Sequence, residues 1–133
     1  DMVSRGLGDV YKRQINVRRI GFVASEITRN GGIAICAPIA PYRQDRKANR
    51  KLISSFGGYI EIFVNTSIEK CEERDVKGLY SLARKGVIEN FTGVSDPYEP
   101  PNNPELIISS TGIDPKVLIE KIYNKVMKLG YVE

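Results

Sequence analysis

The stretch YIEIFVNT, residues 59–66, decides the fold, because it concentrates aromatic and β-branched side chains over the length of one strand. Gly57-Gly58 breaks the chain before it, and its apolar character predicts a strand that is covered on both faces. Two further apolar runs of strand length flank it, GIAICAPIA at 32–40 and LIISST at 106–111. The sequence therefore predicts three strands, well separated along the chain.

Helical periodicity fills the intervals between these strands. The predicted helices span about 15–29, 42–56, 67–74 and 114–129. Ser67 is the expected cap of the third helix, and Asp114-Pro115 is a typical helix start. The buried stripe of the last helix is predicted to comprise Leu118, Ile122, Val126 and Leu129. Strands that alternate with helices predict an α/β fold, a parallel sheet with helices on both faces, whose ligand lies at the carboxyl ends of the strands.

Two segments stand outside this pattern. Residues 1–14, DMVSRGLGDVYKRQ, lack periodicity and resemble the artefactual tails of gene models from fragmentary assemblies, so we expect them to be non-native. Residues 75–104 are rich in glycine and proline around a short helical piece at 79–85. A connection of this length is typical of a functional loop, and we interpret it as a lid.

Composition narrows the class of protein. The chain has 133 residues, enough for one domain, and no apolar run approaches the roughly 18 residues of a membrane span. The net charge is +4, but the bases are mixed with acids, so a small anion is a better expected partner than nucleic acid. With no histidine, a histidine triad or histidine zinc site is excluded. Cys36 and Cys71 are interpreted as reduced, buried thiols of a cytoplasmic protein.

Three clusters could carry chemistry. Arginines follow the first predicted strand, and guanidinium groups there suit phosphate or sulfate, although a solvated helix face would look the same. Cations bracket a glycine at the lid entrance, where they could close over a polyanion or simply coat a surface helix. Aromatic residues in the polar lid could stack on a nucleobase or anchor the loop. The members are Arg43, Arg46 and Arg50, then Arg74, Lys77, Arg84 and Lys85, then Phe91 and Tyr98.

One motif is missing from the sequence. No G-x-x-x-x-G-K-[ST] stretch occurs, so no backbone nest for a triphosphate is visible. Gly6 and Gly8 lie in the suspect tail and no Lys-Ser or Lys-Thr pair follows them.

The motifs from Ile15 to the end of the chain resemble the adenylylsulfate kinase family. The resemblance rests on NVRRIGFVASEI, GIAICAPIAPYRQDR, and then R-D-x-K-G-L-Y, F-T-G and D-P-Y-E-x-P-x-x-P-E in order. It implies a P-loop kinase fold that is truncated at the N-terminus, with residues 15–133 as a partial kinase domain. The implied activity is transfer of the γ-phosphoryl group of Mg-ATP to the 3′-hydroxyl of adenosine 5′-phosphosulfate (APS), giving 3′-phosphoadenylylsulfate (PAPS).

The resemblance also implies roles for individual residues. Asn16 matches a substrate contact, and Arg13 falls where the family has a substrate arginine. Ile39 and Ala40 are expected in the substrate pocket, and Phe91 on the adenine of APS. Lys77, which we take as the catalytic cation, matches the phosphosulfate-binding lid motif together with Gly78 and Leu79. Arg74 is expected against the base of ATP. The magnesium ligands are expected in the missing N-terminal part.

Two departures from the family qualify these roles. Many members have serine at the position of Ala40, and that serine has been proposed to carry a phosphoryl group. Alanine cannot carry one, so any activity of this chain would need direct transfer between the bound substrates. The phosphate loop and the acidic segment after it have no counterpart, and we expect the chain alone to be inactive. The alternatives are a non-catalytic APS- or PAPS-binding regulatory domain of a sulfurylase and another small-molecule P-loop kinase. Family members commonly form homodimers, and the CAPIAPY and GYVE stretches resemble kinase domains that are fused to a sulfurylase.

Overall fold

The computed structural model describes residues 2–93 and 97–133, with the side chains of the first helix described from residue 10 onward. Asp1 of the expected tail and Asp96 of the D-P-Y-E run lie outside the described residues. The chain forms two compact units. Unit 1 comprises Asp1–Tyr59 and Leu79–Pro100, and unit 2 comprises Ile60–Gly78 and Pro101–Glu133.

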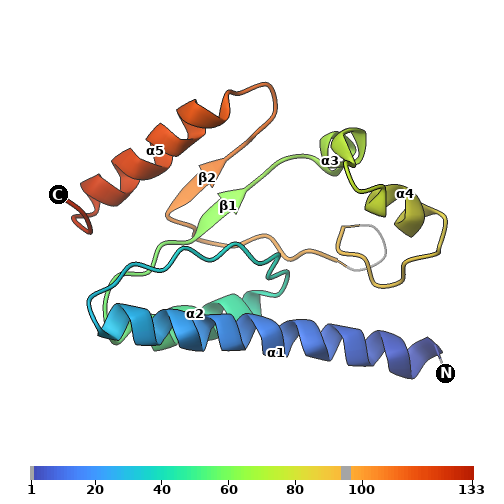
Figure 1. The fold of residues 1–133 in the computed structure, drawn as a ribbon, viewed down its shortest axis with the longest axis horizontal. Helices are drawn as coiled ribbons and strands as arrows, with labels where there is room; N and C mark the ends of the chain where they lie inside the picture. The colour runs from blue at the N-terminus through green and yellow to red at the C-terminus, as the bar shows by residue number, and fades with distance from the viewer. Residues whose placement is uncertain (1, 94–96) are drawn as a thin grey trace. The chain divides into compact units, whose positions relative to one another are not determined.

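Unit 1 is built on two helices that lie side by side, α1 (Met2–Arg29) and α2 (Arg43–Ser54) (Figure 1). The buried positions of α1 recur at helical spacing, at Val17, Gly21, Ala24 and Ser25. On α2 the buried residues are Asp45, Arg46 and Ile53. The helix that we predict from Ile15 therefore exists, but it begins at Met2 and runs through the segment we expect to be a tail.

Close packing of α1 on α2 depends on a glycine. A Cβ atom at Gly21 would overlap the side-chain amide of Asn49. The Asn49 Nδ2 atom donates a hydrogen bond to the carbonyl oxygen of Val17 at 3.0 Å. One turn away, the Arg18 Nε atom donates to Asp45 Oδ1 at 2.8 Å. Polar contacts therefore fix the register of the two helices in addition to apolar burial.

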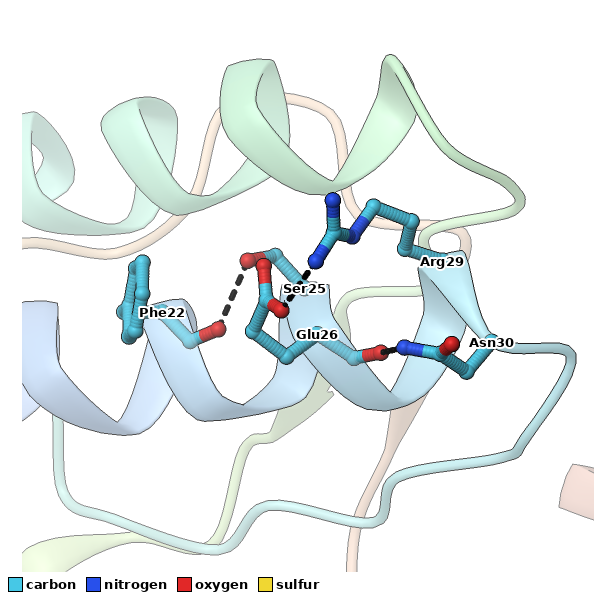
Figure 2. Close-up of polar contacts among 5 residues, drawn as sticks. All are labelled: Phe22, Ser25, Glu26, Arg29 and Asn30. Atoms are coloured by element: carbon cyan, nitrogen blue, oxygen red, sulfur yellow. Dashed lines mark hydrogen bonds and ion pairs between the residues drawn. The ribbon is translucent and has the colours of Figure 1, made fainter.

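The C-terminal end of α1 is closed by local hydrogen bonds (Figure 2). The Ser25 hydroxyl donates to the carbonyl oxygen of Phe22, and Asn30 Nδ2 donates to that of Glu26. Arg29 forms an ion pair with Glu26 across one turn. Gly31 then adopts φ +82°, a conformation that glycine tolerates best, so the predicted stop at Asn30-Gly31-Gly32 is confirmed.

The prediction of a strand at 32–40 is wrong. Residues 33–42 contain neither helix nor strand, and the side chains of Ile33, Ile35 and Ile39 are exposed, Ile35 by 94%. Apolar character alone does not make a strand, because a strand requires a neighbouring strand to bond its backbone groups. Within the described residues, none pairs with this segment. Cys36 is consequently exposed and Cys71 half-buried, so the prediction of two buried thiols is wrong, although both are free.

Unit 2 holds a two-stranded parallel sheet. Strand β1 (Ile62–Val64) pairs with β2 (Leu106–Ile108), with Phe63 opposite Ile107. The parallel α/β class is confirmed, whereas burial of 59–66 on both faces is wrong. Val64 is exposed because, among the described residues, the sheet has only two strands and leaves part of β1 uncovered. Each strand is also shorter than its apolar run.

Two helices of unit 2 begin where the sequence predicts. Helix α3 (Ile68–Arg74) starts after Ser67, whose hydroxyl accepts from Lys70 N–H, and α5 (Pro115–Lys128) starts after Asp114, which caps Lys116 N–H at 2.9 Å. Leu118 of α5 is buried, whereas Leu129, which we predict in the buried stripe, is exposed. The short helical piece that we predict inside the lid is confirmed as α4 (Leu79–Arg84), which belongs to unit 1.

Candidate functional site

Helix α1 carries the first two predicted substrate residues. Arg13 and Asn16 lie three residues apart, so they share one face of the helix. Asn16 is exposed, and Arg13 is half-buried. The neighbouring contacts of Val17 with Asn49 and of Arg18 with Asp45 hold this turn of α1 against α2. Asn16 is therefore presented to solvent from a fixed backbone, as a ligand-binding amide requires.

Ile39 and Ala40 lie in the irregular segment between α1 and α2. The side chain of Ile39 is 69% exposed, and Ala40 is half-buried. Ala40 has φ +44°, which lies in the left-handed region that residues with a Cβ atom seldom adopt. The carbonyl oxygen of Ala40 accepts a hydrogen bond from Arg46 Nη1 at 2.7 Å. Ile39 thus offers an exposed apolar side chain, next to a backbone turn at Ala40 that the buried Arg46 holds.

The arginines after this segment have structural partners rather than a free face. Arg46 is only 9% exposed and also donates to the carbonyl oxygen of Glu99 at 2.5 Å. Arg43 donates through Nε to the carbonyl oxygen of Pro100 at 2.7 Å. The guanidinium group of Arg50 lies over the Tyr59 ring, 4.6 Å from its centroid. Two of the three arginines therefore bind the Glu99–Pro100 segment of unit 1.

The aromatic residues of the expected lid are also engaged. Phe91 contacts Tyr80 of α4 edge to face, with ring centroids 4.9 Å apart. The guanidinium group of Arg46 lies 5.5 Å from the Tyr98 ring centroid. Leu79 begins α4 and its side chain is exposed. Tyr98 is thus an anchor for its loop, whereas Phe91 is half-buried and its ring is held by that of Tyr80.

In unit 2, Arg74 binds Ser110, two residues after the end of β2. Its two terminal nitrogens donate to Ser110 Oγ and to the Ser110 carbonyl oxygen, each at 2.9 Å. Ser110 Oγ lies 2.7 Å from Thr66 Oγ1, and Ser110 N–H donates to Thr66 Oγ1 at 3.2 Å. The sequence points to this edge of the sheet, but it does not single out Thr66 or Ser110. They can be found only once the two strands are known to pair.

Lys77 and Gly78 follow α3 in a tight turn. The amide of Gly78 donates to the carbonyl oxygen of Asp75 at 2.9 Å, and Gly78 adopts φ +67°. Lys77 is exposed, and its ammonium group has no partner among the described residues. An exposed cation beside a flexible glycine can approach an oxyanion without first breaking an ion pair.

A cavity of about 660 Å³ opens along the start of α2 and the stretch of α1 that also carries Arg13 and Asn16. It is lined by Tyr11, Gln14, Ile15, Arg18, Arg19, Phe22, Val23, Gln44 and Asp45. In the described ranges 2–93 and 97–133, no three His, Cys, Asp or Glu side chains converge where they could hold a metal ion. No helix in the same ranges has the length and apolarity needed to cross a membrane.

The structure thus distributes the predicted site residues over both units. Unit 1 carries Arg13, Asn16, Ile39, Ala40, Leu79 and Phe91, and unit 2 carries Arg74, Lys77 and Gly78. Sequence reasoning missed the bond from Asn49 to Val17, the choice of Arg18 as the partner of Asp45, and the binding of Arg46 to Glu99. An asparagine and an aspartate on the inner face of the second predicted helix were the available signal, because polar residues at such positions need a partner.

Sequence comparison relates the chain to one family throughout its length. The model of the family "Adenylylsulphate kinase" matches residues 2–109. An adenylyl-sulfate kinase of Picosynechococcus sp. is 47% identical over 131 residues, which cover 98% of this chain and 72% of the relative. An adenylyl-sulfate kinase of Halothermothrix orenii is 45% identical over 131 residues, covering 98% of this chain and 69% of the relative. The matches include most of residues 1–14.

Solved structures show the same relationship. The Mycobacterium tuberculosis APS kinase in complex with AMPPNP and APS is similar with a TM-score of 0.81 and 32% identity. That match covers 86% of this chain and 66% of the other chain. A hexameric APS kinase from Thiobacillus denitrificans is similar with a TM-score of 0.66 and 42% identity, over 91% of this chain and 19% of the other.

Proposed function

This chain belongs to the adenylylsulphate kinase family, and from that premise we propose that it carries the APS-binding part of an enzyme that phosphorylates the 3′-hydroxyl of APS. The observation that carries the proposal is the 47% identity to an adenylyl-sulfate kinase over 98% of this chain. The similarity to an APS kinase that was solved with AMPPNP and APS supports it. Phosphoryl transfer of this kind depends mainly on positioning and on neutralising charge, and this chain's residues suit both tasks.

Lys77 is proposed to bind the phosphosulfate group. Its ammonium is exposed and has no partner in the described part of the chain, and the left-handed turn at Gly78 follows it. Charge-assisted hydrogen bonds to an oxyanion are about twice as strong as neutral ones. Leu79 continues this motif into α4. In the transition state, the same cation would offset negative charge, which is the sense in which we assign Lys77 a catalytic role.

For the adenosine part of APS, we propose contacts with an aromatic, an amide and an apolar side chain. Phe91 supplies a ring for the adenine, and a stacked base is worth about 1–3 kcal/mol. Asn16 supplies an exposed amide and Ile39 an exposed apolar side chain. Arg13 and Ala40 complete the set of proposed substrate residues.

ATP is proposed as the phosphoryl donor, with Arg74 beside its base. In the structure, Arg74 donates to Ser110, so its guanidinium group is already held just after the end of β2. The described residues offer no cluster that fits magnesium, and we assign no step to that ion in this chain. Activity also requires a backbone nest for the phosphates, and none of the 133 residues forms a G-x-x-x-x-G-K-[ST] motif. We therefore propose that this chain by itself binds APS without turning over ATP.

The first test measures binding and turnover in the same sample. Titration calorimetry should show heat with APS, and an assay coupled to ADP release should show no turnover above background. Lys77→Ala should weaken APS binding by about tenfold or more, because it removes a charge-assisted contact. Lys128→Ala, which removes an exposed cation at the end of α5 in the same unit, is the matched control and should leave the affinity unchanged. Wild-type protein that gives no heat with APS would refute the proposal.

The setting of the protein is a further part of the proposal. Two free cysteines fit a reducing compartment, so we propose a cytoplasmic location. The hexameric Thiobacillus denitrificans relative supports association of this chain with copies of itself, whether or not a sulfurylase domain is attached. The non-catalytic regulatory domain remains the second candidate, because the missing phosphate-loop motif favours binding without turnover.

A further inference from the structure

Arg46 joins two segments of unit 1 that are distant in sequence. Its Nη1 atom donates to the carbonyl oxygen of Ala40 at 2.7 Å, and its Nη2 atom donates to that of Glu99 at 2.5 Å. The Cζ atom of the same guanidinium group lies over the Tyr98 ring, 5.5 Å from its centroid. We call these three contacts the Arg46 clamp. A planar fork with fixed donors can satisfy all three at once, whereas a lysine ammonium cannot.

The two clamped segments also contact each other directly. The amide of Glu99 donates to the carbonyl oxygen of Pro41 at 2.9 Å. Arg43 adds a hydrogen bond to the carbonyl oxygen of Pro100. Residues 40–41 and 98–100 are therefore held together by one direct backbone bond and by the side chains of Arg43 and Arg46, which lie on the same turn of α2. Because Arg46 is 9% exposed, water competes little for its contacts.

The clamp acts where the backbone is under strain. Ala40 has φ +44°, and a residue with a Cβ atom in this region persists only where its surroundings enforce it. The hydrogen bond from Arg46 to the Ala40 carbonyl oxygen is a direct source of that enforcement. Loss of the clamp would let Ala40 relax and would release Glu99 at the same time.

We propose that Arg46 is a positioning residue, which couples the strained turn at Ala40 to Tyr98 and Glu99 so that the two segments move as one. The link to catalysis rests on the proposed function, in which Ala40 lines the APS pocket. Arg46 does not touch the substrate in this proposal. It sets the position of the residues that do.

The coupling can be read from hydrogen exchange. Within residues 97–101 only Tyr98 and Glu99 have backbone amides, because the other three residues are prolines. A peptide that spans this stretch therefore isolates the clamped segment in exchange detected by mass spectrometry. Arg46→Lys keeps the charge and removes the fork, so this stretch should exchange about tenfold faster without any ligand. The matched control is Arg50→Lys on the same helix, whose guanidinium stacks on Tyr59 instead, and it should leave the rate unchanged.

A second measurement adds APS. In wild-type protein, APS should slow exchange in residues 97–101, and in Arg46→Lys this slowing should be lost while APS binds several-fold more weakly. A residue that served only stability would change the free rate but keep the response to APS. Should Arg46→Lys unfold, Tyr98→Leu removes the stacked ring alone and should still raise the rate in 97–101.

The outcomes separate this inference from the proposed function. An unchanged rate in Arg46→Lys, or an APS response equal to that of wild type, would overturn the coupling. If wild-type protein failed to bind APS, the proposed function would fall, and the comparison of Arg46→Lys with Arg50→Lys would still decide whether the clamp holds the two segments together.

Discussion

The helix pair α1–α2 and the segment that joins the two helices respond differently to the same kind of apolar sequence. On the helices, Ala24 and Ile53 are buried between partners that the chain supplies. In the joining segment, Ile33 and Ile35 are as apolar but lie exposed. A helix satisfies its own backbone and needs only one neighbour for its apolar stripe, whereas a strand needs neighbours on its edges before its faces can be covered.

The helix interface and the joining segment also differ in their polar contacts. The helix interface contains Asp45, 2% exposed, which pairs with Arg18, and Asn49, which bonds the backbone of α1. In the joining segment, the carbonyl oxygens of Ala40 and Pro41 accept hydrogen bonds from Arg46 and Glu99, next to the start of α2. Specific polar contacts therefore accompany burial in this unit. Stability should be concentrated in the helix pair, and three substitutions test this.

The largest effect is expected from Ile53→Ala. Truncation of this buried side chain should lower the free energy of unfolding by about 2–4 kcal/mol, through lost burial and a cavity. The matched control Ile35→Ala removes the same atoms from a side chain that is 94% exposed, and should change the free energy by less than about 0.5 kcal/mol. Urea unfolding, followed by circular dichroism, measures both. Equal losses would show that the exposed segment is as well packed as the helix pair.

A smaller loss, about 2 kcal/mol, is expected from Arg18→Ala, because it leaves the Asp45 carboxylate buried without its partner. Arg18 is partly exposed, which keeps the loss below that of a fully buried pair. In an Asp45→Ala background, the same substitution should cost much less. A double-mutant cycle in urea measures the difference. Additive effects would mean that the ion pair contributes nothing to the interface.

The smallest of the three effects belongs to Gly21→Ala. The added Cβ atom should displace the Asn49 amide and break its bond to Val17, a net loss of about 1 kcal/mol after the gain in helix propensity. With Asn49→Ala already present, the overlap disappears, and Gly21→Ala should become neutral or stabilising. Thermal unfolding of wild type, of the two single variants and of the double variant measures the effect of Gly21→Ala on stability in each background. Destabilisation of equal size in both backgrounds would place the close contact elsewhere.

The sequence predicts local features of this chain well. The start of α3 at Ser67, the start of α5 at Asp114-Pro115 and the stop of α1 at Gly31 are all confirmed, because a few neighbouring residues determine each of them. The parallel α/β class follows from the order of the elements, and the family from motifs. The prediction of a strand at 32–40 failed because a strand depends on residues that lie far away in sequence.

The fate of the arginines shows what only the tertiary structure decided. By themselves, Arg43, Arg46 and Arg74 predict anion binding as readily as any other role. In the structure, Arg46 donates a hydrogen bond to Glu99, 53 residues away, and Arg74 donates one to Ser110, 36 residues away. A guanidinium group binds whichever carbonyl or hydroxyl oxygens the fold brings within reach, so its role depends on distant backbone. The sequence alone determined where helices begin and end and which residue types can meet a nucleotide, because those properties are local.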